Sequence, residues 1–183
     1  MPDVEYARLD APATRAILKE IRPVYAAGFP GYSLDDWETR TTRQVGYPGF
    51  ETITARDGDG SLIGFVYGFP LASSSWWEGL TPAPPPGYTD EDGTRTVAVI
   101  DLVVLPAFRS RGIGRRLVDL YLSDRAQRRA TLTTSPAKPD IQRMYERWGW
   151  TQVGRVPGGP LATAEYYDVY VIDLGPAEPT SSR

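Results

Sequence analysis

The middle of the chain constrains the fold most, because a buried strand there leads directly into a glycine-containing turn and a helix. Residues 96–105 form an almost continuous run of β-branched and aliphatic side chains, which is typical of a strand buried on both faces. Asp101 is the one ionisable residue inside this run, and a buried carboxylate needs polar partners. Pro106 lacks an amide hydrogen and ends the strand. The stretch therefore predicts a central strand that stops at a loop.

The residues after this strand have the composition of an anion-binding turn. A helix that begins near Ile113 leaves the amide hydrogens of its first turn without helical acceptors, and its macrodipole places partial positive charge there. Gly112 and Gly114 have no Cβ atom, so a large anion can lie against the backbone. Arg109 and Arg111 can add charge-assisted hydrogen bonds to phosphate oxygens. The turn is therefore predicted to bind a pyrophosphate.

Two motifs follow one another along this part of the chain. The first is Leu102-x-Val104-x-Pro106 followed by Arg109-x-x-Gly112-x-Gly114. The second is Met144-Tyr145-Glu146-Arg147-Trp148-Gly149-Trp150. The first resembles the acyl-coenzyme A signature of the GNAT superfamily of N-acetyltransferases, and the second resembles that superfamily's helix with a tyrosine followed by glycine and an aromatic residue. The resemblance covers residues 96–152, with one helix and one strand between the two motifs.

The remaining elements fit the order that the resemblance implies. Hydrophobic patterns predict strands over 4–9, 50–56, 62–69, 96–105, 130–134, 151–156 and 166–174, and helices over 11–27, 34–43, 113–129 and 138–148. Pro23 should kink or split the first helix. The resemblance implies an α+β fold in which a mixed, mostly antiparallel sheet of about six to seven strands is flanked by about four helices. We expect one GNAT-like domain over residues 1–174 and a disordered tail over 175–183.

Composition excludes several kinds of chemistry. The 183 residues include no cysteine and no histidine, which removes thiolate nucleophiles, disulfides and the commonest metal ligand and general base; no metal site is predicted. A formal net charge of −3 argues against a nucleic-acid partner, because nucleic-acid-binding domains are normally basic. The sequence has no signal-peptide pattern and no apolar run of membrane-spanning length, so we expect a soluble cytoplasmic protein without a membrane partner.

Other known motifs fit the turn less well. A dinucleotide-binding turn would have a third glycine where this chain has Leu117, and repeated βαβ units are not predicted. A nucleotide-binding P-loop would end in Gly-Lys-Ser/Thr. A serine hydrolase needs a base that a histidine-free chain does not easily provide.

The resemblance implies that acetyl-coenzyme A is the cofactor and that the strand end and the turn bind it. The cofactor-binding residues that it implies are Val103, Val104, Arg109, Ser110, Arg111, Gly112, Ile113, Gly114 and Arg115. Backbone groups over 103–105 would meet the pantetheine arm, and an amide near Val104 would reach the thioester oxygen. The alternative for the arginines is a solvated helix face. Arg125, Arg128 and Arg129 are explained more simply as cations at the carboxyl end of the helix.

Two residues are candidates for acid–base catalysis. Tyr145 takes the position of the general acid in many members of the superfamily, and a phenol of pKa about 10 can protonate a thiolate whose conjugate acid has a pKa of about 8.5. Asp101 lies where many members carry a glutamate base, and its shorter side chain would act through water. The alternatives are a core tyrosine for Tyr145 and a structural hydrogen-bond acceptor for Asp101.

The acceptor pocket is expected in the loops. The irregular segment 73–92 contains Trp76 and Trp77, which can line a pocket for an amine together with Phe29 and Tyr32 of an earlier turn; the alternative for the two tryptophans is to anchor the loop to the core.

The predicted function is transfer of an acetyl group to a primary amine of a small molecule by direct attack in a ternary complex, since the chain has no cysteine and Ser110 has no evident base. A protein N-terminus or lysine is the alternative acceptor, and a non-catalytic acyl-coenzyme A sensor is the alternative function. The resemblance also allows a homodimer, with the apolar run 166–171 as its candidate interface.

Overall fold

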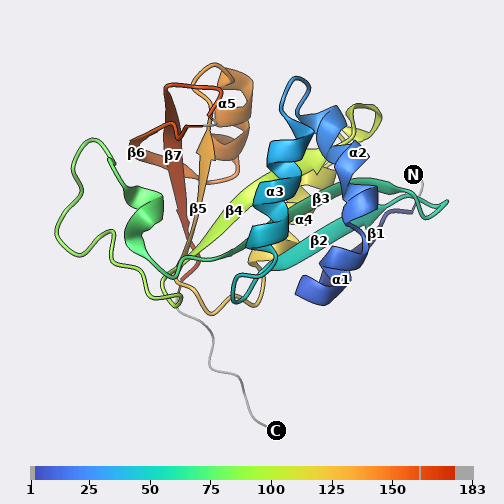
Figure 1. Ribbon diagram of the computed structural model, residues 1–183, viewed down its shortest axis with the longest axis horizontal. Helices are drawn as coiled ribbons and strands as arrows, with labels where there is room; N and C mark the ends of the chain where they lie inside the picture. The colour runs from blue at the N-terminus through green and yellow to red at the C-terminus, as the bar shows by residue number, and fades with distance from the viewer. Residues whose placement is uncertain (1–2, 161, 176–183) are drawn as a thin grey trace, which may run out of the picture. The chain divides into compact units, whose positions relative to one another are not determined.

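The computed structural model describes residues 3–160 and 162–175 (Figure 1). In chain order these residues form β1 Glu5–Leu9, α1 Ala11–Ala16, α2 Leu18–Gly28, α3 Leu34–Gln44, β2 Glu51–Arg56, β3 Leu62–Pro70, β4 Thr96–Val104, α4 Ile113–Leu122, β5 Arg129–Thr134, α5 Pro139–Arg147, β6 Thr151–Pro157 and β7 Tyr166–Asp173. The strand order is β1-β2-β3-β4-β5-β7-β6, with β4 and β5 parallel. The expected α+β fold is confirmed, with five α-helices among the described residues.

The chain divides into two compact units. Among the described residues, one unit comprises those up to Phe69 together with Val99–Ser123, and the other comprises Pro70–Ala98 together with those from Asp124 onward. Strand β4 contributes its first part to the second unit and its remainder to the first. The single domain expected over 1–174 stays a prediction, and residues 176–183 of the expected tail lie outside the described residues.

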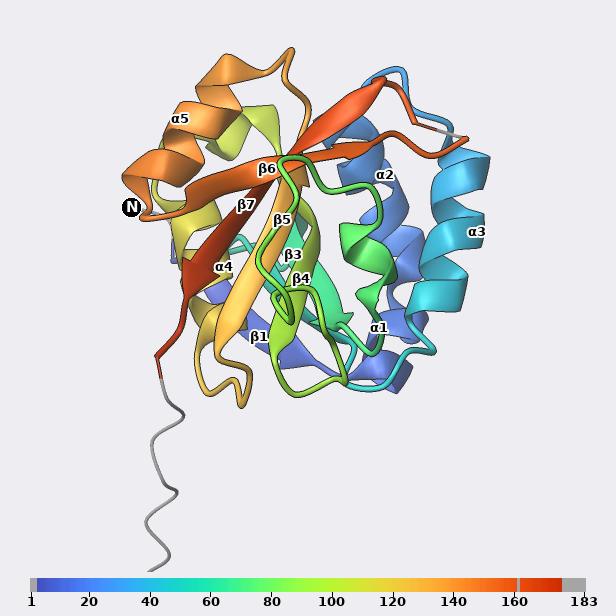
Figure 2. The ribbon, with the colours of Figure 1, turned by 90° about the vertical axis from the view of Figure 1, so that its left-hand side faces the viewer.

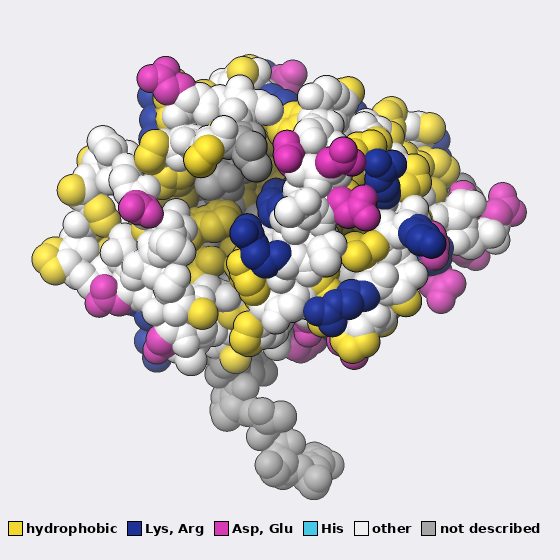
Figure 3. Space-filling model, viewed as in Figure 1, with side chains coloured by type: hydrophobic (Ala, Val, Ile, Leu, Met, Phe, Trp, Pro, Cys, Tyr) yellow, Lys and Arg dark blue, Asp and Glu magenta, His cyan; other side chains and the backbone are white. Residues whose placement is uncertain are grey.

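In the first unit, α1, α2 and α3 lie on one face of the strands β1–β3 and α4 lies on the other (Figures 1 and 2). Strand β3 is buried from Leu62 to Phe69, as a strand covered on both faces must be. Helices α2 and α3 carry side chains of both charges on their solvent side (Figure 3), where Arg22 lies 3.6 Å from Glu38. The opposite side of these helices supplies apolar residues to the core.

The first helical segment breaks at Ile17 and not at Pro23, which lies inside α2. Asp10 caps α1, accepting a 3.0 Å hydrogen bond from the amide of Ala13. A buried hydrogen bond of 3.0 Å between the hydroxyls of Thr14 and Thr52 fixes α1 to β2. This contact joins residues 38 positions apart, so no local pattern contains it.

Helix α4 is shorter than the sequence predicts, and the segment after it is not helical as far as Arg129. Asp124 has a φ of 59°, and this left-handed conformation cannot continue a right-handed helix. Arg8 of β1 donates hydrogen bonds to the carbonyls of Leu120 and Ser123 at the helix end, at 2.5 and 3.2 Å. The interpretation of Arg125, Arg128 and Arg129 as cations at the end of this helix was therefore wrong, because α4 ends at Leu122 and Arg129 begins β5.

In the second unit, β7 lies between β5 and β6 and pairs antiparallel with both, and α5 covers one face of β5 and β7 (Figure 2). The long connection 71–95 is joined to β6 by a bridge between Thr81 and Arg155. The run 166–171, the candidate interface, is thus an inner strand whose residues Val169 and Tyr170 are buried within this chain. None of the described helices has the length and apolarity needed to cross a membrane.

Candidate functional site

The turn between β4 and α4 adopts a backbone that favours anion binding. Ser110 and Gly112 have φ values of 61° and 79°, in the left-handed region that glycine enters without steric cost. Gly112 lies directly before α4, and apart from its own atoms and its two chain neighbours no atom of the described residues lies within 4 Å of the point where its Cβ would be. The glycine is therefore needed for its conformation, and the space in front of the helix is open.

The first turn of α4 combines helix amides with cationic side chains. No side chain among the described residues caps this helix, and its first turn holds no acidic residue. The amides of Ile113 and Gly114 point out of the helix end, where the macrodipole adds positive potential. The Arg111 guanidinium lies 5.4 Å from the centre of the Phe108 ring. The position suits a phosphate group.

Two further arginines of this region already have partners. Arg109 Nε donates a 3.0 Å hydrogen bond to the carbonyl of Val104, which ties the turn to the strand end. Arg115 Nε lies 2.9 and 3.0 Å from the carboxylate oxygens of Asp119. Both arginines are thus held beside the turn.

The end of β4 lies beside the turn that follows α2. A Cβ on Gly28 would lie 2.5 Å from Val103 Cγ1, so only glycine lets the end of α2 approach the strand this closely. The ring of Phe29, the next residue, lies 4.8 Å from that of Tyr25 and 5.4 Å from that of Tyr32. The structure therefore brings Phe29 and Tyr32 near the strand that carries Asp101 and the predicted cofactor-binding residues.

Asp101 is buried, and its Oδ2 atom accepts two hydrogen bonds. The donors are Arg40 Nη2, at 2.5 Å, and the hydroxyl of Tyr67. That hydroxyl in turn accepts a 2.8 Å hydrogen bond from Trp37 Nε1 and lies 3.2 Å from Thr41 Oγ1. Burial raises the pKa of Asp101, while the Arg40 charge and both hydrogen bonds oppose the rise in pKa.

Sequence reasoning missed these partners of Asp101. A carboxylate inside a buried strand does signal that a donor or cation must face it. The pattern does not say which residue does so, because Arg40 precedes Asp101 by 61 positions in the chain. The sequence does not indicate Tyr67 as a partner of Asp101 either, because Tyr67 lies within the apolar run of β3.

Tyr145 belongs to the second unit and lies near the end of α5. Its side chain is buried, and its ring meets those of Trp148 and Trp150 edge-on at 5.5 and 5.8 Å. Gly149, at a φ of 90°, ends the helix, and the amide of Trp150 donates to the carbonyl of Tyr145 at 3.1 Å. This Schellman-type ending explains the spacing of tyrosine, glycine and aromatic residue in the second motif.

Buried Asp168 on β7 holds α5 in place. Its carboxylate accepts hydrogen bonds from Gln142 of α5 at 2.6 Å, from Gln152 at 2.9 Å and from Arg155 at 2.7 Å. Gln142 lies about one helical turn before Tyr145. The tyrosine is therefore presented by a helix that is fixed to the sheet on the adjacent turn.

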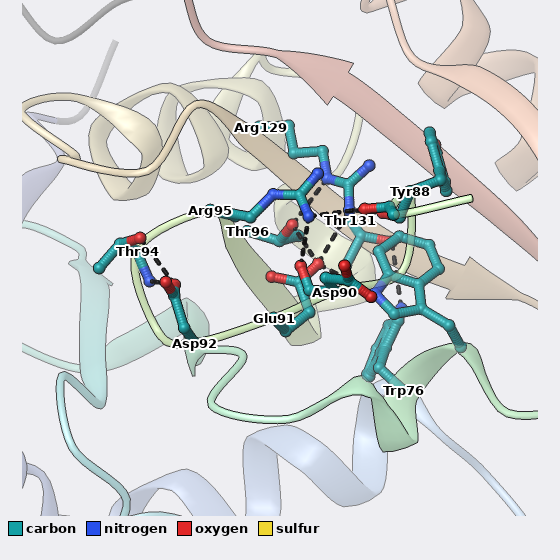
Figure 4. Close-up of polar contacts among 12 residues, drawn as sticks. Trp76, Tyr88, Asp90, Glu91, Asp92, Thr94, Arg95, Thr96, Arg129 and Thr131 are labelled. Atoms are coloured by element: carbon teal, nitrogen blue, oxygen red, sulfur yellow. Dashed lines mark hydrogen bonds and ion pairs between the residues drawn. The ribbon is translucent and has the colours of Figure 1, made fainter. Parts of the chain in front are cut away.

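Trp76 and Trp77 use their indole N–H groups inside the second unit. Trp76 Nε1 donates to Thr131 Oγ1 at 3.2 Å, and Trp77 Nε1 donates to Glu91 Oε1 at 3.0 Å. Figure 4 shows Glu91 and Arg129 directed toward each other, and Arg129 Nη2 lies 2.9 Å from Glu91 Oε1. These contacts anchor the segment 73–92 to the sheet; binding of an acceptor by the two tryptophans stays a prediction.

A family model described as the acetyltransferase (GNAT) family matches residues 14–150 of the chain. None of the curated proteins gave a match to the sequence. Many solved structures share the fold.

Three of these structures are enzymes whose names give different acceptors. A GNAT superfamily phosphinothricin acetyltransferase from Sinorhizobium meliloti, in complex with AcCoA, is 17% identical with a TM-score of 0.61, over 98% of this chain and 92% of that one. A spermidine/spermine N-acetyltransferase from Vibrio cholerae is 15% identical with a TM-score of 0.57, over 93% and 92%. The ribosomal-protein-S18-alanine N-acetyltransferase from Escherichia coli is 10% identical with a TM-score of 0.66, over 99% and 100%. At these identities the likeness concerns the fold.

Proposed function

Because the chain belongs to the acetyltransferase (GNAT) family, we propose that it transfers the acetyl group of acetyl-coenzyme A to a primary amine of a small molecule. The observation that carries the proposal is the turn before α4, where a left-handed glycine precedes a helix end with no side-chain cap. Amides and arginines meet there in the arrangement that binds phosphate. The similar enzyme from Sinorhizobium meliloti was solved with AcCoA, which supports the same cofactor here.

The turn would bind the diphosphate through the amides of Ile113 and Gly114, with Arg109 and Arg111 adding charge. Backbone groups of Val103 and Val104 would hold the amide-bearing arm of the cofactor. The parallel ladder between β4 and β5 ends at Ala98, so it does not use the backbone groups of Val103 and Val104, although the Val104 carbonyl accepts from Arg109. When bound, the cofactor supplies an activated acetyl thioester.

Two side chains would move protons in this reaction. Asp101 would accept a proton from the ammonium form of the acceptor, directly or through water, at Oδ1, since both hydrogen bonds to its side chain from described residues end on Oδ2. Tyr145 would donate its hydroxyl proton to the departing thiolate. The chain contains no cysteine, which supports direct transfer without an acyl-enzyme.

A small amine suits the aromatic surroundings of Asp101. Phe29 and Tyr32 lie beside the strand that carries this carboxylate, and aromatic faces attract cations. The Vibrio cholerae enzyme acts on spermidine and spermine by its name, whereas the Escherichia coli enzyme acts on a ribosomal protein, so the fold serves both kinds of acceptor. The proposal includes a cytoplasmic location, as expected from the sequence.

The test is release of free thiol from acetyl-coenzyme A across a panel of small amines and peptide N-termini, with cofactor binding followed by calorimetry. We expect cofactor binding and turnover on a small amine. Binding without turnover on any amine would favour the sensor, turnover confined to peptides would favour a protein acceptor, and no binding of coenzyme A would overturn the assignment.

Replacing Tyr145 with phenylalanine tests the general acid. We expect the turnover number to fall at least about tenfold, because the thiolate loses its proton donor, while the affinity for coenzyme A is unchanged. Tyr170→Phe is the matched control, since it removes a hydroxyl that donates to Glu146 of the same helix at 3.2 Å. Equal turnover in wild type and Tyr145→Phe would remove Tyr145 from this role.

A further inference from the structure

We propose that Tyr67 is a positioning residue for Asp101. Trp37 donates to the Tyr67 hydroxyl and thereby directs the hydroxyl proton to Asp101 Oδ2. Asp101 Oδ1 is then the oxygen that receives the acceptor's proton. The inference rests on the proposed function and adds to it a residue that the sequence did not suggest. It follows from the direction of each hydrogen bond in the buried group Trp37, Thr41, Tyr67, Arg40 and Asp101 (the Asp101 network).

The direction of the hydrogen bond from Trp37 is fixed by chemistry. An indole N–H can only donate, so the 2.8 Å contact of Trp37 Nε1 places its hydrogen on a lone pair of the Tyr67 oxygen. A tyrosine hydroxyl has a single proton. That proton does not go to Trp37, and it is available for Asp101.

The contact with Asp101 takes this proton. An ionised carboxylate only accepts hydrogen bonds, so the contact between the Tyr67 hydroxyl and Asp101 Oδ2 has Tyr67 as its donor. Thr41 Oγ1, 3.2 Å from the same hydroxyl, must then donate to it. Burial and the neighbouring Asp101 charge raise the pKa of Tyr67, which keeps the proton on the tyrosine.

Arg40 and Tyr67 share one oxygen of Asp101 but contribute differently. Arg40 brings a positive charge, and its guanidinium also lies near Tyr25 of α2. The titratable groups that face Asp101 in this unit are Arg40 from α3, Tyr67 from β3 and Tyr25 from α2. Arg40 therefore offsets the charge of the carboxylate, whereas Tyr67 adds an uncharged donor of fixed direction to the same oxygen, Oδ2.

This arrangement orients the carboxylate for work as a base. With Oδ2 held by two donors, the carboxylate cannot rotate freely about its χ2 torsion, and Oδ1 stays in one place. A fixed, pre-oriented base is what efficient proton transfer requires. Loss of the Tyr67 hydroxyl would release one of the two restraints and one hydrogen bond that favours the ionised form.

The experiment compares the wild type with Tyr67→Phe and Trp37→Phe, using a ¹³C NMR titration of the Asp101 carboxyl carbon in protein labelled at aspartate, with Asp101→Asn to assign the signal. We expect the Asp101 pKa to rise by about one unit in Tyr67→Phe, corresponding to a tenfold change in proton affinity. The rise should be smaller in Trp37→Phe, which keeps the Tyr67 donor but frees its orientation. The acid limb of the kcat/KM profile should move by the same amount as the NMR titration.

Tyr121→Phe is the matched control, because it removes the hydroxyl of a fully buried tyrosine on α4, the opposite face of these strands; the Asp101 titration should not move. An unchanged Asp101 pKa in Tyr67→Phe would overturn the inference, and the Trp37 variant provides the same test if Tyr67→Phe does not fold. If the NMR titration moves but Asp101→Asn keeps full activity at every pH, the hydrogen-bond lock is supported and the assignment of Asp101 as base fails.

Discussion

The Asp101–Arg40 pair of the first unit and the Glu91–Arg129 pair of the second both join a buried carboxylate to an arginine, but their surroundings differ. Oxygen Oε1 of Glu91 accepts from Trp77, Thr96 and Arg129, at 3.0, 2.6 and 2.9 Å, and its side chain is 0% exposed. The Arg129 guanidinium lies 4.9 and 4.4 Å from the ring centres of Trp77 and Tyr88. The arginine is thus enclosed together with its carboxylate.

The Asp101 pair is more open. The Arg40 side chain is 35% exposed, against 13% for Arg129. Asp101 also lies on a strand that continues into the predicted cofactor turn. A buried carboxylate beside an arginine thus anchors a loop at Glu91, where both side chains are enclosed, whereas at Asp101 the arginine of the pair is open to solvent.

The largest effect is expected from Arg129→Met, which breaks the enclosed pair. A fully buried Glu91 without its cation should lower the free energy of unfolding by about 3–5 kcal/mol, measured by urea denaturation. The double variant Glu91→Gln/Arg129→Met should recover much of this loss, because no buried charge is left. A loss below about 1 kcal/mol in the single variant would show that the pair is not the anchor of segment 73–92.

Next in size is the effect of Asp101→Asn on activity. We expect kcat/KM to fall about 10²-fold through loss of the base, with the acid limb of its pH profile removed, measured by steady-state kinetics. Equal pH profiles for the two proteins would instead support the purely structural role of Asp101.

Asp101 should also affect stability in a pH-dependent way. Its pKa in the folded protein is raised from the ordinary 3.8, so the folded state binds this proton more tightly than the unfolded state. The wild type should therefore lose stability relative to Asp101→Asn as the pH rises from 3.8 through the raised pKa. Urea denaturation at a series of pH values measures this difference, and a wild type that gains stability over the variant in this range would contradict the raised pKa.

The smallest effect is expected at a pair that is exposed on both sides. Arg115 and Asp119 of α4 have side chains that are 44% and 46% exposed. Asp119→Asn should change the free energy of unfolding by no more than about 0.5 kcal/mol, since solvent screens such pairs. If Arg115 contributes to phosphate binding, the same variant should bind coenzyme A slightly more tightly in calorimetry; a weaker affinity would argue against that contribution.

Local patterns predicted the elements that bear the candidate site. The apolar run of β4, the stop at Pro106 and the glycine before α4 depend on neighbouring residues only. The contacts of Arg8 with the end of α4 and of Thr52 with Thr14 of α1 were not predictable, because they join residues far apart in the sequence. For the same reason Arg129 was assigned to a helix end although it begins β5.

Residues that are close in the sequence specify the central strand, the glycine turn before α4 and the tyrosine–glycine–aromatic ending of α5, because each depends on torsion preferences and hydrogen bonds within a few residues. The partners of Asp101, Glu91 and Asp168 depend instead on how the chain folds. Burial requires each of these carboxylates to have hydrogen-bond donors or cations as partners. Those partners lie on other segments of the chain, which only folding brings close to the carboxylate.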